Sequence, residues 1–241
     1  MATYQDVFAR YEKKYKLTLS QYAALRRWLQ DRMEVDSYGL HTICNIYYDT
    51  PDFQLIRTSL EKPVYKEKLR LRSYGVPGGD TPVFVELKKK LDGVVYKRRV
   101  SLPLREAKRY LAYEGRPDLD CQILREIDWA LARYPLEPKA FIAYDRIALF
   151  GREDPDLRIT FDCNLRWRDA FLDLSQGDWG QPLLDKQEIL MEAKLPAAMP
   201  LWLSHVLDRL QIRQTSFSKY GACYQQNLFP ALLSTGGICV A

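Results

Sequence analysis

The stretch KEKLRLRS at residues 66–73 decides the fold. Its alternation predicts a β-strand, in which successive side chains point to opposite faces of a sheet. Four cations then share one face, and two leucines share the other. The cations are Lys66, Lys68, Arg70 and Arg72. Like charges about 7 Å apart repel one another, and the neighbouring sequence supplies nothing that neutralises them. Such a face must be open to water or bind an anion.

Other stretches repeat this pattern of an apolar face and a charged face. They are PVFVELKKK at 82–90, VVYKRRV at 94–100, LRITFD at 157–162 and ILMEAKLP at 189–196. A sheet with one face in water explains any single strand, but such faces ordinarily mix the two signs of charge. Lys and Arg dominate here. The sheet is therefore expected to be apolar outside and charged inside.

Short glycine turns at 76–80 and 92–93 join three of these strands into an antiparallel meander. Amphipathic stretches predict helices at 18–33, 104–113, 121–134 and 200–212. A sheet of this kind closes most economically into a barrel, because closure removes its edges and helices can pack on its outer wall. Burying unpaired cations in a dry interior costs several kcal/mol each, so the lumen must hold water or a polyanion. The sequence thus predicts an α+β protein with a basic tunnel for phosphates.

Composition narrows the class of protein. The 241 residues are 47% hydrophobic and contain no linker or repeat, so we expect one domain over 1–241, with the last ten residues as a flexible tail. The net charge of +5 is too small to require a nucleic-acid-coating surface. Five scattered cysteines predict neither a disulfide framework nor a zinc site, and no apolar run reaches the roughly 18 residues of a membrane span. A cytoplasmic protein is expected.

Few of the usual catalytic motifs are present. The chain has two histidines, His41 and His205, which excludes a histidine-rich metal site and disfavours phosphohistidine or Ser/His chemistry. Neither a GxxxxGK[ST] loop nor a GxGxxG loop after a strand occurs. Phosphate must therefore be bound by side chains.

Taken in order, several stretches resemble a known family. They are EKKYKLT, NIYYDTPDFQLIRTSLE, KEKLRLRSYG, VFVELKKKLDGVVYKRRVSLPL, AYDRIAL, LRITFD, ILMEAKLP and SFSKYG. Together they resemble the VTC-type polyphosphate polymerase domain, a branch of the CYTH or triphosphate tunnel metalloenzyme superfamily. The resemblance implies a closed, antiparallel, eight-stranded β-barrel with helices outside. It also implies binding of ATP and inorganic polyphosphate or triphosphate, with Mn²⁺ or Mg²⁺ held near a glutamate.

Site residues follow from the resemblance. The predicted catalytic residues are Arg70, Arg72, Lys88, Arg146, Arg158, Glu192 and Lys219, with Glu192 as the metal ligand. The predicted phosphate-binding residues are Lys14, Arg57, Lys68, Arg70, Arg72, Lys88, Lys97, Arg99, Arg146, Arg158, Lys194 and Lys219. The superfamily opens with an ExExK strand, whereas this chain has Arg10, Glu12 and Lys14 at those alternate positions. One carboxylate is therefore replaced by a cation, which argues against a metal role for Glu12.

The expected function is metal-dependent transfer of the γ-phosphate of ATP onto a growing polyphosphate chain. Fewer acids favour elongation over hydrolysis, because hydrolysis needs a carboxylate that positions and activates water. The alternatives are a tunnel-type inorganic or nucleoside triphosphatase and a non-catalytic polyphosphate-binding module. No nucleic acid is expected as a partner, since the charge lies on interior faces with few aromatic residues. A membrane-protein partner is left open.

Overall fold

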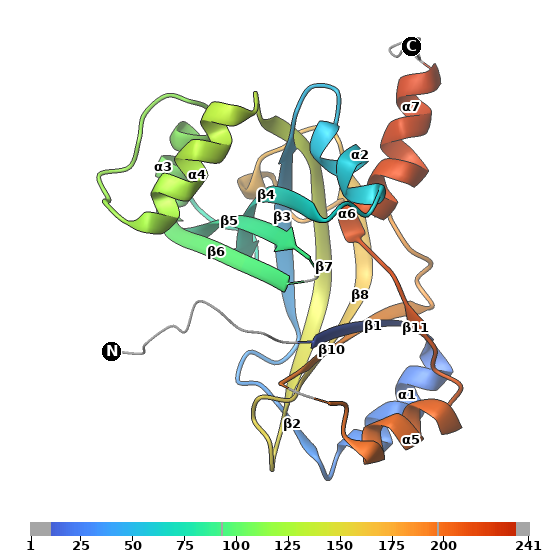
Figure 1. Ribbon diagram of the computed structural model, residues 1–241. Coiled ribbons are helices and arrows are strands. Elements are labelled where there is room, and N and C mark those ends of the chain that lie inside the picture. The colour runs from blue at the N-terminus through green and yellow to red at the C-terminus, as the bar shows by residue number, and fades with distance from the viewer. Residues whose placement is uncertain (1–10, 93, 197, 235–241) are drawn as a thin grey trace.

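The computed structural model describes residues 11–92, 94–196 and 198–234 (Figure 1). The strands are β1 (Tyr11–Thr18), β2 (Met33–Val35), β3 (His41–Asp49), β4 (Tyr65–Tyr74), β5 (Pro82–Leu91), β6 (Val94–Pro103), β7 (Glu137–Gly151), β8 (Arg158–Arg168), β9 (Gln181–Pro182), β10 (Glu188–Leu195) and β11 (Gln214–Thr215). The helices are α1 (Leu19–Leu29), α2 (Gln54–Leu60), α3 (Leu104–Leu111), α4 (Gln122–Arg133), α5 (Leu201–Arg209), α6 (Lys219–Cys223) and α7 (Phe229–Ser234).

All strands belong to one antiparallel sheet. Its order is β11-β1-β10-β8-β7-β3-β4-β5-β6, with β2 added to β7 and β9 added to β8. The expected closed, eight-stranded barrel was therefore wrong. The sheet has eleven strands, and within the described ranges no hydrogen-bonded ladder joins β6 to β11. The end strand β11 contains only two residues, and the side chain of Lys88 on β5 reaches Glu12 on β1 across the opening.

The predicted division into an apolar face and a charged face is confirmed in β4. Leu69 and Leu71 lie in an apolar core with Val85 of β5, beneath α3 and α4. A second core lies beneath α1 and α5, where Ile159 of β8 and Met191 of β10 are buried. Figure 1 shows these two helix pairs at opposite ends of the sheet. Each pair covers an outer, apolar face, and the cations are left to the inner face.

Helix α6 lies on the inner face, contrary to the expectation that helices pack only outside. The ring of Tyr220 in α6 stacks on Tyr47 of β3 at a centroid distance of 4.7 Å. The Tyr220 hydroxyl donates to the buried carboxylate of Asp49 over 3.0 Å. Asp49 also accepts the backbone N–H groups of Leu55 and Ile56 at the start of α2. The stacked rings of Tyr47 and Tyr220 fill one end of the concave face and position Lys219 inside it.

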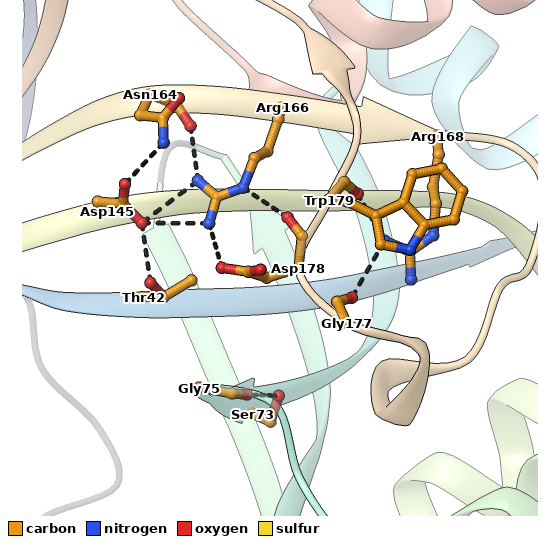
Figure 2. Close-up of polar contacts among 10 residues, drawn as sticks. All are labelled: Thr42, Ser73, Gly75, Asp145, Asn164, Arg166, Arg168, Gly177, Asp178 and Trp179. Carbon is orange, nitrogen blue, oxygen red and sulfur yellow. Dashed lines mark hydrogen bonds and ion pairs between the residues drawn. The ribbon is translucent and has the colours of Figure 1, made fainter.

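A β-bulge in β8 sets the direction of side chains near the middle of the sheet. Asn164 has a left-handed φ of 50°, and the pairing of β7 with β8 shifts there by one residue. Asp145 accepts hydrogen bonds from Asn164 (2.8 Å) and Arg166 (3.2 Å) on the outer face (Figure 2). The shift turns Leu165 inward, although it has the same odd parity as the outward-facing Ile159.

Some predictions fall outside the described residues. Arg10 and residues 235–241, most of the expected tail, are among them. Residues 232–234, the beginning of that predicted tail, form the end of α7. In the part of the chain that the structure describes, no helix has the length and apolar character needed to cross a bilayer.

Candidate functional site

A buried carboxylate organises the basic side chains of β4, β5 and β6. Glu86 on β5 is only 1% exposed, and its Oε2 accepts from Arg70 Nε at 2.7 Å. Its other oxygen, Oε1, lies 2.8 Å from Lys97 Nζ, while Arg72 Nη1 is 3.7 Å from Oε2. Burial raises the pKa of Glu86, but the charges of Arg70, Arg72 and Lys97 outweigh burial and hold that pKa well below its usual value. Glu86 is therefore ionised and shared by three cations.

A second buried carboxylate, Asp162 on β8, also organises basic side chains around it. Asp162 is 2% exposed and accepts two hydrogen bonds from Arg146, at 2.6 and 2.8 Å, in a bidentate pair. Lys219 Nζ donates to Asp162 Oδ2 over 2.6 Å. Burial raises the pKa of Asp162, but Lys219 and Arg146 more than reverse this, and the pKa lies below its usual value. The bulge at Asn164 lies two residues further along β8.

Among the contacts of the described residues, Lys14 and Lys68 of the inner face hydrogen-bond to neutral groups and not to a buried carboxylate. Lys14 Nζ donates to the Phe217 carbonyl at 3.0 Å, and Lys68 Nζ donates to Ser218 Oγ at 3.0 Å. Burial, followed by the charges of Lys88 and other lysines, lowers the pKa of Lys68 to about 7. Burial likewise lowers the pKa of Lys97 to about 8, although Glu86 opposes the shift. This face therefore holds cations at an energetic cost that a bound polyanion would relieve.

Glu12 of β1 and Glu192 of β10 lie together on adjacent, paired strands. Burial raises the pKa of Glu192, but its neighbour Glu12 and the charge of Lys194 more than reverse this, and the pKa lies well below its usual value. Lys194 Nζ is 3.3 Å from Glu192, and Lys88 Nζ is 3.6 Å from Glu12. Within the described ranges no three His, Cys, Asp or Glu side chains gather as a metal cluster. Two carboxylates fit Mg²⁺ or Mn²⁺, since Mg²⁺ commonly takes one or two carboxylates and fills its sphere with water and phosphate oxygens.

The structure brings eleven of the twelve predicted phosphate-binding residues to the inner face. Besides those above, Arg99 lies over the ring of Phe84, and Arg158 is exposed beside Lys194 in the pairing of β8 with β10. Arg57 is the exception, because it is exposed on α2 and pairs with Asp52.

Sequence reasoning missed the roles of Glu86 and Asp162. It treated the cations of the opening strand as lacking a neutralising partner, whereas Arg70 and Arg72 both contact Glu86 from the next strand. The available signal was a single acid at an inward-facing position of each stretch, in VELKKK and in ITFD. Parity alone could have found it, but only the register shows which cations each acid contacts.

The chain is similar to known proteins in sequence and in fold. The sequence matches the VTC domain over residues 9–228. A solved structure named "putative adenylate cyclase" from Bacillus halodurans has a TM-score of 0.56 at 15% identity, over 89% of this chain and 96% of that one. A "putative adenylyl cyclase" from Hippeastrum, described as having a dominant triphosphatase activity, has a TM-score of 0.47 at 15% identity, over 95% and 98%.

No curated protein matches the sequence. The Bacillus halodurans likeness concerns the fold alone, while the domain match extends over most of the chain, from β1 to the residues that follow α6. The chain therefore belongs to the VTC domain family.

Proposed function

We propose that this protein transfers the γ-phosphoryl group of ATP to the end of a polyphosphate chain. The observation that carries the proposal is the inner face itself, where basic residues from seven strands and α6 surround a short row of carboxylates. Phosphoryl transfer has a loose transition state with charge spread over the phosphoryl oxygens. Catalysis then depends on positioning and on neutralising charge, and needs no protein nucleophile.

The arginines and the lysines of the inner face are suited to different parts of the phosphate ligand. Arg70 and Arg146 present planar guanidinium groups that are already oriented by Glu86 and Asp162, so each can hold phosphate oxygens with little further loss of side-chain freedom. Lys14, Lys68 and Lys88 supply compact charges along the same face. We assign the arginines to the reacting phosphates and the lysines to the polyphosphate chain.

Glu192 and Glu12 would hold the divalent ion that the superfamily implies. When bound, Mg²⁺ or Mn²⁺ would draw charge from the bridging phosphate oxygens. Glu192 is mostly buried and ionised, which suits a ligand. Glu12 lies beside Glu192 and would supply the second carboxylate.

The test is incubation of the purified protein with ATP and either Mn²⁺ or Mg²⁺, followed by gel and ³¹P NMR analysis for long phosphate chains. Glu192→Gln keeps the size of the side chain and removes its charge. We expect product formation to collapse in this variant while triphosphate binding without metal persists or tightens. Normal synthesis by Glu192→Gln would contradict the proposed role of this residue.

One observation favours a second candidate, hydrolysis of a triphosphate. Glu12 and Glu192 form a pair of carboxylates beside the cations, and such a pair can position water. The same experiment separates the two reactions, since a triphosphatase releases orthophosphate and makes no chains. Binding of polyphosphate with neither product would instead identify a binding module.

A further inference from the structure

A row of aromatic rings crosses one rim of the inner face. Tyr38 precedes β3, and the row continues through His41 of β3, Tyr74 of β4 and Phe84 of β5. Successive ring centroids lie 5.9, 5.9 and 5.8 Å apart. The guanidinium of Arg99 lies 4.8 Å from the centre of the Phe84 ring and ends the row.

This row is more exposed than packing alone requires. Tyr38 is 77% exposed and Tyr74 is 51% exposed, whereas the large aromatic residues beneath α6 are buried. Single exposed aromatic residues are common, but here two exposed tyrosines belong to one continuous row of four rings on one rim. Exposed rings beside an arginine are the usual means of stacking a nucleobase, because every base has a π face.

The row lies directly next to the cations that would hold phosphates. Phe84 is the cross-strand partner of Arg72, and Tyr74 follows Arg72 by two residues on the same face of β4. Arg99 is the partner of Glu86, whose carboxylate also contacts Arg70. A nucleotide with its phosphates at Arg70 and Arg72 would therefore have its base within reach of Tyr74 and Phe84.

The geometry points to a nucleobase-binding subsite on this aromatic row. Such a subsite would let the inner face distinguish a nucleoside triphosphate from inorganic polyphosphate. The inference rests on the proposed function only in requiring that the inner face bind a triphosphate. It goes further by assigning to Tyr38, Tyr74 and Phe84 the part of the ligand that carries no phosphate.

Binding of ATP and of inorganic triphosphate to the same variants tests the inference. In isothermal titration calorimetry, Tyr74→Ala should weaken ATP binding roughly 5- to 150-fold, the loss equivalent to about 1–3 kcal/mol of base stacking. Binding of inorganic triphosphate should change less than about twofold, because stacking is absent from that complex. Tyr38→Ala, in the most exposed ring, should show the same selectivity with a smaller loss for ATP.

Tyr11→Ala is the matched control, because Tyr11 is an exposed tyrosine on the outer side of β1 and lies outside the row. It should leave both affinities unchanged. Equal losses for the two ligands in Tyr74→Ala, or no loss for either, would overturn the subsite. Failure of the unmodified protein to bind inorganic triphosphate would instead overturn the proposed function, and the inference would fall with it.

Discussion

At the scale of single residues, the basic face is a balance between paired and unpaired cations. Arg70 and Arg146 have buried carboxylate partners, so their charges are stable when the site holds no anion. Among the hydrogen bonds described, the one partner of Lys68 is the hydroxyl of Ser218, and other lysines surround Lys68. Its depressed pKa, about 7, means that the free protein penalises its charge.

The lowered pKa of Lys68 predicts that the protein takes up a proton when it binds triphosphate. Its pKa in the unfolded chain is about 10.4, so its contribution to stability is complete above that pH and is lost as pH falls toward 7. A bound anion restores the higher pKa, so affinity should fall as pH rises above about 7. Calorimetry at pH 8 in two buffers with different ionisation enthalpies should give an uptake close to one proton at Lys68.

Lys97, with a pKa of about 8, adds a smaller uptake of its own. Lys68→Met is therefore the informative variant, because it should remove most of the proton uptake and leave the contribution of Lys97. Identical uptake in Lys68→Met and in the unmodified protein would show that Lys68 does not face the bound anion.

At the scale of elements, β8 is the strand on which the site depends most. Its bulge at Asn164 lets one strand direct Asp162 toward Arg146 and Lys219, and direct Arg166 outward to Asp145 and Asp178. Figure 2 shows Arg166 held between these two outer carboxylates. The contacts of Arg166 with Asp145 and Asp178 on the outer face thus hold the same β8 backbone that carries the inner ion pairs.

Replacing Asn164 tests this arrangement. Asn164→Val should lower the free energy of unfolding by about 1–2 kcal/mol more than Asn164→Gly, since both lose the hydrogen bond to Asp145 but only the β-branched residue is strained at a left-handed φ of 50°. Asn164→Gly tolerates that φ and should lose only the hydrogen bond to Asp145, at a cost of about 0.5–1.5 kcal/mol. Urea unfolding measures both. A valine variant as stable as the glycine variant would show that the bulge carries no conformational constraint.

At the scale of the whole molecule, the two ends of the open sheet meet through polar contacts. Lys88 of β5 pairs with Glu12 of β1, and Lys14 of β1 reaches the carbonyl of Phe217, while Lys68 of β4 reaches Ser218. These side chains are on or beside the proposed phosphate path. A bound polyanion would therefore connect strands that the backbone ladder leaves apart.

We accordingly expect inorganic triphosphate to stabilise the whole fold. At a hundredfold excess over its Kd, the gain should be about 2.7 kcal/mol, because the ligand binds only the folded state. Urea unfolding with and without triphosphate measures the gain, and hydrogen exchange should slow in both β6 and β1. Arg27→Ala, on the exposed side of α1, should leave the gain unchanged. An unfolding midpoint that triphosphate does not move would contradict the tunnel.

The sequence by itself determined which residues face inward in most strands. Alternation in KEKLRLRS places Leu69 outside and Arg70 inside because a strand has a period of two, a property of covalent geometry that needs no partner. Ordered stretches such as MEAK and SFSKYG also carried the family resemblance, which the match to the VTC domain confirms.

Only the tertiary structure decided how the inward residues combine. The pairing of Arg70 with Glu86 depends on the register between β4 and β5, and that of Lys219 with Asp162 joins residues 57 positions apart. The inversion at Asn164, the open sheet and the row from Tyr38 to Phe84 likewise depend on curvature and register. Local periodicity fixes the direction of a side chain, but its partner is fixed by how distant strands are brought together.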